Sequence, residues 1–170
     1  MERAIYGLAM PFKDMYWKYD RLTNTYTFDK TNKESIIFDT VVGITIDHDY
    51  SRSLGDIRDN LIVKANEHGV CFKLIPNDPL GYSAYKKVKR GALRHCSVSY
   101  LVIKTNRDVK AEQQAADLLN TLKWNERIVV NEYKKILLFE ICLTNYPANP
   151  ATFCTTEKDH PLLKGVNWDE

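Results

Sequence analysis

The sequence predicts a mainly β protein of the α+β class, with antiparallel strands in a barrel or sandwich and helices packed outside. Short runs rich in β-branched and aromatic residues recur along the chain, turn residues separate them, and only two segments have helical composition. The length of 170 residues suits one domain with its own core. The chain after Pro147 is rich in Pro, Asn, Thr and Lys, so we expect the domain to cover residues 1–153 and an irregular tail to follow over 154–170.

The first half of the chain contains the shorter predicted strands. Residues 3–9 form a first strand, and residues 21–28 carry the polar centre of a hairpin turn with Thr and Tyr on its flanks. Residues 35–38 and 41–47 are short β-branched runs. Residues 61–75 predict two strands joined by a tight turn, whose glycine can adopt a positive φ.

The second half predicts two helices and three further strands. Asp78 can cap the free amides of a helix that begins at Pro79 and runs to about Arg90. A basic cluster in and just after this helix is either a solvated helix face or a surface for an acidic partner. It comprises Lys86, Lys87, Lys89, Arg90 and Arg94. Residues 108–122 form the second helix, with Asp108 as a possible cap. The predicted strands cover residues 95–104, 126–132 and 135–143.

Composition and motifs exclude several function classes. The formal net charge of +2 is too balanced to indicate nucleic-acid binding. None of the four cysteines forms a C-x-x-C pair, which argues against a zinc ribbon and favours buried thiols in a reducing cytoplasm. The sequence has no signal-peptide-like segment, no apolar run of about 18 residues, and no G-x-S-x-G, P-loop, G-x-G-x-x-G or H-E-x-x-H motif. We expect no cofactor, no metal, no membrane association and no direct nucleic-acid binding.

Four polar residues occupy positions where chemistry is possible. His48 follows an apolar strand and is either a general base or a surface histidine between two aspartates. Ser97 and Ser99 share one face of a predicted strand, and the local pattern does not distinguish a nucleophile from a hydroxyl bonded to the backbone. Glu140 is a lone carboxylate in an apolar run, so it needs a partner such as an imidazole N–H unless it lies on the wet face of an edge strand.

Four segments, taken in order, carry a family resemblance: AIYGLAMPF (4–12), DHDYSRSLGDI (47–57), CSVSYLV (96–102) and EICLTNYPANPAT (140–152). They resemble the prohead protease family of tailed phages, which shares the fold of the herpesvirus assemblins. The strongest element is Glu140 followed by Pro-Ala-Asn-Pro at 147–150. The resemblance therefore extends over most of the chain.

The sequence departs from the family pattern at three places. Ser99 stands where the family usually has glycine, and residues 38–40 (Phe-Asp-Thr) replace a Gly-Ala-Phe segment. The predicted helix over 108–122 is an insertion between the nucleophile strand and the glutamate strand. None of these departures removes a catalytic group of the family.

The resemblance implies an assemblin-like antiparallel β-barrel surrounded by helices. It implies Ser97 as nucleophile, His48 as base and Glu140 as the third member that orients the base. It also separates the two candidate serines, because Ser97 aligns with the family's nucleophile. His68 or His95 is an alternative third member, since assemblins use a second histidine in that role.

The resemblance further implies a serine endopeptidase that acts during phage head maturation. Its substrates would be the scaffolding portion of the major capsid protein and its own terminus, cut inside the procapsid in the host cytoplasm. Family analogy suggests a homodimer. Two other readings stay open at this point: a catalytically inactive assembly protein that retains the protease fold, and an unrelated β-rich binding module.

Overall fold

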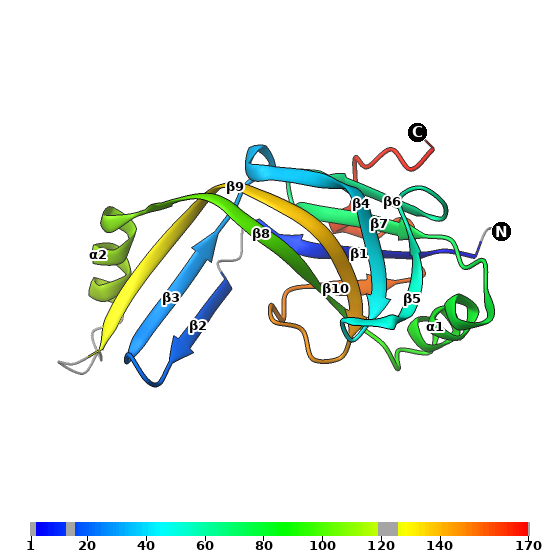
Figure 1. Cartoon of the computed structure of the whole chain (residues 1–170), viewed down its shortest axis with the longest axis horizontal. Helices are drawn as coiled ribbons and strands as arrows, with labels where there is room; N and C mark the ends of the chain where they lie inside the picture. The colour runs from blue at the N-terminus through cyan, green and yellow to red at the C-terminus, as the bar shows by residue number, and fades with distance from the viewer. Residues whose placement is uncertain (1–2, 13–15, 119–125, 170) are drawn as a thin grey trace.

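The structure is a computed structural model, which describes residues 3–12, 16–118 and 126–169. Its strands form two sheets (Figure 1). Hydrophobic side chains pack between them. The smaller sheet has four antiparallel strands in the order β10–β1–β7–β6. These strands are β1 (Ile5–Pro11), β6 (Leu61–Ala65), β7 (Gly69–Leu74) and β10 (Phe153–Thr155).

The larger sheet has six strands and is organised around β9. On one edge of β9, β3 and then β4 run parallel to it, and β8 runs antiparallel along the other edge. Two further strands extend the sheet, because β2 pairs with β3 and β5 pairs with β4. The strands are β2 (Tyr16–Asp20), β3 (Thr25–Lys30), β4 (Ile36–Ile46), β5 (Asp49–Asp56), β8 (His95–Arg107) and β9 (Arg127–Thr144).

The α+β, mainly β class is confirmed, but two details of the expected architecture are not. The β3–β9 and β4–β9 pairings are parallel, although the sequence predicted antiparallel strands throughout. No closed barrel is found among the described strands. Local sequence patterns define which segments are extended, whereas strand partners and directions depend on tertiary packing.

Strand β9 is one continuous strand of 18 residues, and the two predicted strands with a turn at Tyr133–Lys134 are therefore wrong. The Tyr133 side chain is buried and stacks edge-on against Tyr100, with ring centroids 6.0 Å apart. This contact keeps Tyr133 and Lys134 within the strand. They lie at the point where the pairing partner of β9 changes from β3 to β4.

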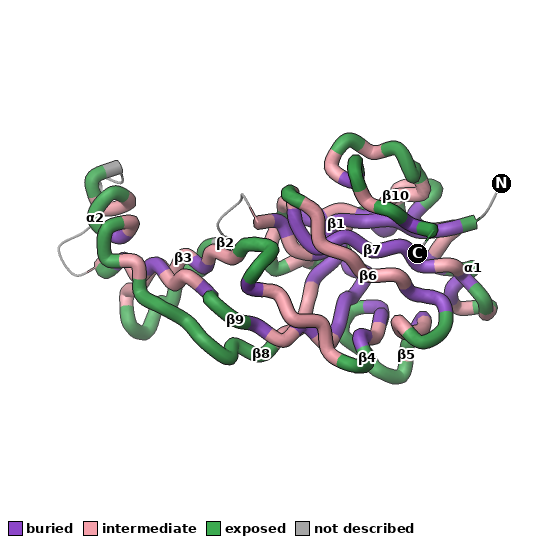
Figure 2. The backbone as a smooth tube through the Cα atoms, turned by 90° about the horizontal axis from the view of Figure 1, so that it is seen from above, coloured by how far each residue is buried: buried purple, intermediate pink, exposed green. Residues whose placement is uncertain are grey.

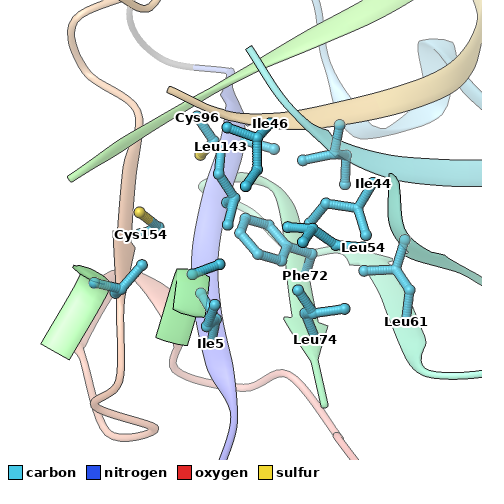
Figure 3. Close-up of a cluster of buried hydrophobic side chains, with 14 of the residues drawn as sticks. Ile5, Ile44, Ile46, Leu54, Leu61, Phe72, Leu74, Cys96, Leu143 and Cys154 are labelled. Atoms are coloured by element: carbon cyan, nitrogen blue, oxygen red, sulfur yellow. The ribbon is translucent and has the colours of Figure 1, made fainter. Parts of the chain in front are cut away.

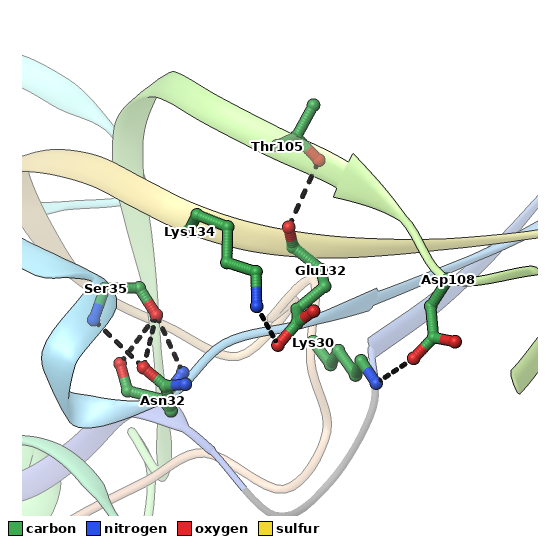
Figure 4. Close-up of polar contacts among 7 residues, drawn as sticks. All are labelled: Lys30, Asn32, Ser35, Thr105, Asp108, Glu132 and Lys134. Atoms are coloured by element: carbon green, nitrogen blue, oxygen red, sulfur yellow. Dashed lines mark hydrogen bonds and ion pairs between the residues drawn. The ribbon is translucent and has the colours of Figure 1, made fainter.

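The C-terminal part of β8 and the N-terminal part of β9 form an arm together with β2, β3 and helix α2 (Val109–Leu118). This arm extends from the main body (Figure 2). Polar contacts join the arm's elements (Figure 4): Lys30 of β3 pairs with Asp108 before α2, and Thr105 Oγ1 of β8 donates to the Glu132 carbonyl of β9 at 3.4 Å. The predicted cap is confirmed, because the Ala111 amide donates to Asp108 Oδ1 at 3.0 Å. The last residues of the predicted helix, from 119 on, lie outside the described residues.

The core lies between the two sheets and is built from large aliphatic side chains around Phe72 (Figure 3). Ile5, Ile44 and Leu143 come from β1, β4 and β9 and are 0% exposed, so this packing fixes β4 and β9 in place. Helix α1 (Pro79–Lys89) is confirmed as predicted, with the Gly81 amide donating to its Asp78 cap at 2.6 Å. Two short 3-10 helices, η1 (Lys33–Ser35) and η2 (Pro161–Leu163), complete the elements.

Residues 156–169 pack onto the outer side of the smaller sheet. Trp168 is 3% exposed and meets the Tyr6 ring edge-on, with centroids 5.5 Å apart. Leu163 of η2 joins the same cluster. No helix among the described residues has the length and hydropathy needed to cross a bilayer.

Candidate active site

His48 occupies a two-residue turn between β4 and β5. Ile46 and Asp49 are paired across this hairpin, so Asp47 and His48 are its two central residues. Both have a positive φ, 54° and 57°, as a type I′ turn requires. This backbone conformation is unfavourable for a histidine and is maintained by the paired strands on either side. The imidazole is thereby held at the end of a rigid hairpin.

Glu140 lies on β9 and is 1% exposed. Three side chains converge on its carboxylate: Thr45 Oγ1 donates to Oε1 at 2.7 Å, Ser99 Oγ donates to Oε2 at 2.6 Å, and His48 Nδ1 lies 2.9 Å from Oε2. These partners come from three adjacent elements, β4, β8 and the β4–β5 turn. The expected imidazole partner of this buried carboxylate is therefore present.

The electrostatic state of Glu140 follows from these contacts. Burial raises the pKa of the carboxyl group, but the hydrogen bonds from Ser99, His48 and Thr45 outweigh burial and hold the pKa below its ordinary value. The side chain is therefore an anion at neutral pH. An anion at this position favours a proton on His48 Nδ1 and leaves Nε2 as the basic nitrogen of the ring.

Ser99 lies on the wrong side of the imidazole to be the nucleophile. Its hydroxyl donates to Glu140 and is 3.3 Å from His48 Nδ1, the nitrogen that faces the carboxylate. In a serine protease triad, the nucleophile transfers its proton to the opposite nitrogen, Nε2. The position of Ser99 is thus that of a residue that supports the histidine–carboxylate pair.

Ser97 lies on the same face of β8 as Ser99, because side chains alternate along a strand. It stands opposite Cys142 in the β8–β9 register, next to the pair formed by Ser99 and Glu140. Burial raises the pKa of the Cys142 thiol to about 11, and backbone groups of His48 and Ser97 are among its neighbours. Ser97 and His48 therefore border the same thiol. Ser97 is 7% exposed, and no described residue forms a hydrogen bond with its hydroxyl.

A cavity of about 150 Å³ opens beside Ser97. Its wall includes residues of β8, the end of β1, the end of β3 and the loop before β10. The hydroxyl that the sequence points to thus stands at the edge of a space that can receive another molecule. In the described part of the chain, no group of three or more His, Cys, Asp and Glu side chains is arranged to hold a metal ion.

The structure brings together two of the three predicted site residues and places the third nearby. His48 and Glu140 are in contact, whereas Ser97 forms no hydrogen bond with either residue. The alternative third members lie elsewhere: His68 Nε2 is 3.4 Å from Glu67, and His95 Nδ1 is 2.7 Å from a backbone carbonyl of the loop before β10.

Thr45 is the site residue that sequence reasoning missed. The residue is 2% exposed, and its hydroxyl donates to Glu140 from the neighbouring strand. A threonine in an apolar strand three residues before His48 was the available signal. That signal was weak, because a threonine hydroxyl can also bond to the backbone and β-branched residues are common in strands.

No curated protein and no solved structure matches the chain. The family described as Caudovirus prohead serine protease matches residues 6–162 of the 170. This range contains both sheets, the His48–Glu140 pair and the strand that carries Ser97. The chain belongs to the Caudovirus prohead serine protease family.

Proposed function

We propose that Ser97, His48 and Glu140 are the catalytic residues of this prohead protease, with Ser97 as nucleophile, His48 as base and Glu140 orienting the base. The observation that carries the proposal is the contact of 2.9 Å between His48 Nδ1 and a buried carboxylate. This contact leaves His48 Nε2 as the base. Ser97 and Ser99 share one face of β8, and because the carboxylate engages Ser99, the Ser97 hydroxyl is the one that remains available.

In the proposed mechanism, His48 Nε2 accepts the Ser97 proton while the hydroxyl oxygen attacks the carbonyl carbon of a peptide bond. The imidazolium then donates this proton to the leaving amine, and water resolves the acyl-enzyme by the same route. Glu140 accepts a hydrogen bond from Nδ1 throughout and stabilises the positive ring. General acid–base catalysis of this kind contributes about 10² to 10⁴ in rate.

The bond between Ser97 and His48 is expected to form when substrate is present. Catalytic hydrogen bonds are often loose in the free enzyme and tighten in the Michaelis complex. Ser99, two residues along β8 from Ser97, already lies 3.3 Å from His48 Nδ1, and a rotation of the His48 side chain is the movement that we propose closes the triad. His48 has the freedom for it, because 41% of its side chain is exposed.

The family membership supports a role in capsid maturation. As the finer part of the proposal, the substrate is the scaffolding portion of the major capsid protein. The protease also removes a segment of its own chain, and it acts as a homodimer inside the procapsid in the host cytoplasm. Cleavage of the scaffold at that stage empties the space that DNA will occupy.

Co-expression with the capsid precursor tests the catalytic assignment. Ser97→Ala and His48→Ala are expected to stop processing, whereas the matched variant Ser99→Ala, on the same strand face, is expected to retain it. Processing is followed by electrophoresis and by mass spectrometry of the capsid protein. Processing by Ser97→Ala at the wild-type rate would show that this serine is not the nucleophile.

A further inference from the structure

The cavity beside Ser97 contains a single charged group. Of the described residues that line it, Asp29 alone carries a charge. Asp29 belongs to β3 and is 6% exposed. A buried carboxylate is costly unless it has partners, so its presence in this wall requires an explanation.

The carboxylate of Asp29 is only partly neutralised by the protein itself. Asn131 Nδ2 donates to Oδ1 at 2.9 Å, Lys18 Nζ lies 3.2 Å from Oδ2, and the Tyr133 hydroxyl, which also lines the cavity, donates to the same carboxylate. Lys18 is not part of the cavity wall, and 55% of its side chain is exposed. An ion pair with a half-exposed lysine contributes little, because water screens it and the long side chain loses conformational freedom. A carboxylate has about four acceptor sites, so Asp29 retains the capacity to accept one further donor from the cavity side in addition to Tyr133.

The rest of the cavity wall suits a flexible aliphatic chain. Met10, Val98, Tyr100 and Tyr133 all contribute to it, and burial together with the negative charge of Asp29 raises the pKa of the Tyr133 hydroxyl, which stays a neutral donor. A cavity of about 150 Å³ can hold a molecule the size of benzene, which has about six heavy atoms. The lysine side chain has four methylene groups and one amine, and thus fits this volume.

We propose that this cavity binds a lysine side chain of the substrate next to the scissile bond, and that Asp29 is the residue that selects it. This proposal rests on the assignment of Ser97 as nucleophile. The methylene groups pack against the apolar wall, and the ammonium group donates to Asp29. An uncharged aliphatic side chain would fill the same space but would cover the carboxylate without offering it a donor, which costs binding energy. An arginine side chain has two more heavy atoms and a branched end, so it is expected to fit less well.

The test uses the purified chain and a library of fluorogenic peptides with one fixed position at a time, from two residues before the scissile bond to one residue after it. Lysine is compared with norleucine, which has the same four side-chain carbons but no ammonium group. We expect kcat/KM for lysine to exceed that for norleucine by about tenfold or more at one position, as for a hydrogen bond to a charged partner. The absence of a lysine preference at every position would overturn the proposal.

Two variants assign the preference to Asp29. Asp29→Asn is expected to abolish the preference for lysine over norleucine, whereas Asp117→Asn, an exposed aspartate on α2 of the same arm, is expected to leave it unchanged. Lys18→Ala removes the competing cation and is expected to increase the preference. A lysine preference that persists in Asp29→Asn, or that falls in Lys18→Ala, contradicts the proposal.

These outcomes separate the proposal from the assignment of the nucleophile. If the wild-type chain cleaves peptides and Ser97→Ala does not, the nucleophile stands whatever the specificity proves to be. If cleavage is independent of Ser97, the proposed active site fails first. The wild-type comparison of lysine with norleucine needs no substitution, so it remains decisive even if Asp29→Asn does not fold.

Discussion

Replacement of Glu140 by glutamine tests the electrostatic part of the site most sharply. The substitution keeps the shape of the side chain but exchanges one carboxylate oxygen for an NH2 group. In the native site both oxygens accept hydrogen bonds, one from Thr45 and the other from Ser99 and His48. The amide oxygen can serve only one of these two sides, so its orientation determines the tautomer of the histidine.

The magnitude follows from the two possible orientations. If the amide oxygen faces His48, the Thr45 hydroxyl can accept the amide N–H and the ring keeps its proton on Nδ1. The loss is then that of a charged partner replaced by a neutral one, about 1.5 kcal/mol, or about tenfold in rate. If the NH2 group faces His48, the ring proton is forced onto Nε2, and losses of about 10⁴ are typical of such a wrong tautomer. We expect the first orientation and a fall of about 10- to 100-fold.

Measured kcat/KM with a fluorogenic peptide checks this expectation for Glu140→Gln. Thr45→Val combined with Glu140→Gln removes the hydroxyl acceptor that keeps the amide oxygen facing His48. The kcat/KM is therefore expected to fall much further, toward the loss of about 10⁴ that is typical of the wrong histidine tautomer. Thr45→Ser with Glu140→Gln keeps a hydroxyl and is the matched control. Equal activity of Glu140→Gln and the wild type would refute the role of the carboxylate, and equal activity of the two double variants would refute the orientation argument.

Three further predictions concern stability. Ser99→Ala removes a donor to the buried carboxylate of Glu140, so it is expected to lower the free energy of unfolding by about 1.5–3 kcal/mol. Its kcat/KM is expected to stay within about tenfold of the wild type. Denaturant titration and peptide kinetics measure the two quantities, and complete inactivity would contradict the supporting role of Ser99. Because the pKa of Glu140 is depressed in the folded state, the carboxylate stabilises the fold above its unfolded pKa of about 4.3, and this stabilisation is lost as the pH falls through the lower folded value. The stability difference between the wild type and Glu140→Gln should therefore be constant near neutral pH and shrink below about pH 4.3; a difference that grows in acid contradicts the depressed pKa. Gly55→Ala places a Cβ atom 1.7 Å from Asn60 Oδ1 at a φ of +134°, so a loss of about 3 kcal/mol is expected in the same titration, and unchanged stability would mean that this contact is not present.

Local sequence signals predicted the elements that are stabilised locally. Helix α1 was predicted from Asp78 and Pro79, because a cap and a first-turn proline act within a few residues. Strand β5 was not predicted, since Asp49–Asp56 is rich in polar residues and is held by pairing with β4. The short strand β10 was missed for the same reason: its pairing with β1 comes from far along the chain.

The candidate site was predictable where burial imposes a strong cost. A lone carboxylate in an apolar strand required a partner, and this requirement led to the expectation that Glu140 meets a histidine. The supporting hydroxyls of Thr45 and Ser99 carried no such signal, because a short hydroxyl finds a partner in many environments. The β4–β5 turn that presents His48 could not be predicted either. Its two central residues have a positive φ, but neither is a glycine, the residue that usually indicates such a turn.

The identity of the nucleophile is tested most directly by labelling the purified protein with a serine-directed fluorophosphonate and mapping the adduct by tandem mass spectrometry. We predict one adduct on Ser97, present in Ser99→Ala and lost in His48→Ala, with His95→Ala as the matched histidine control that keeps it. An adduct on Ser99, or labelling of Ser97 that does not depend on His48, would contradict the assignment.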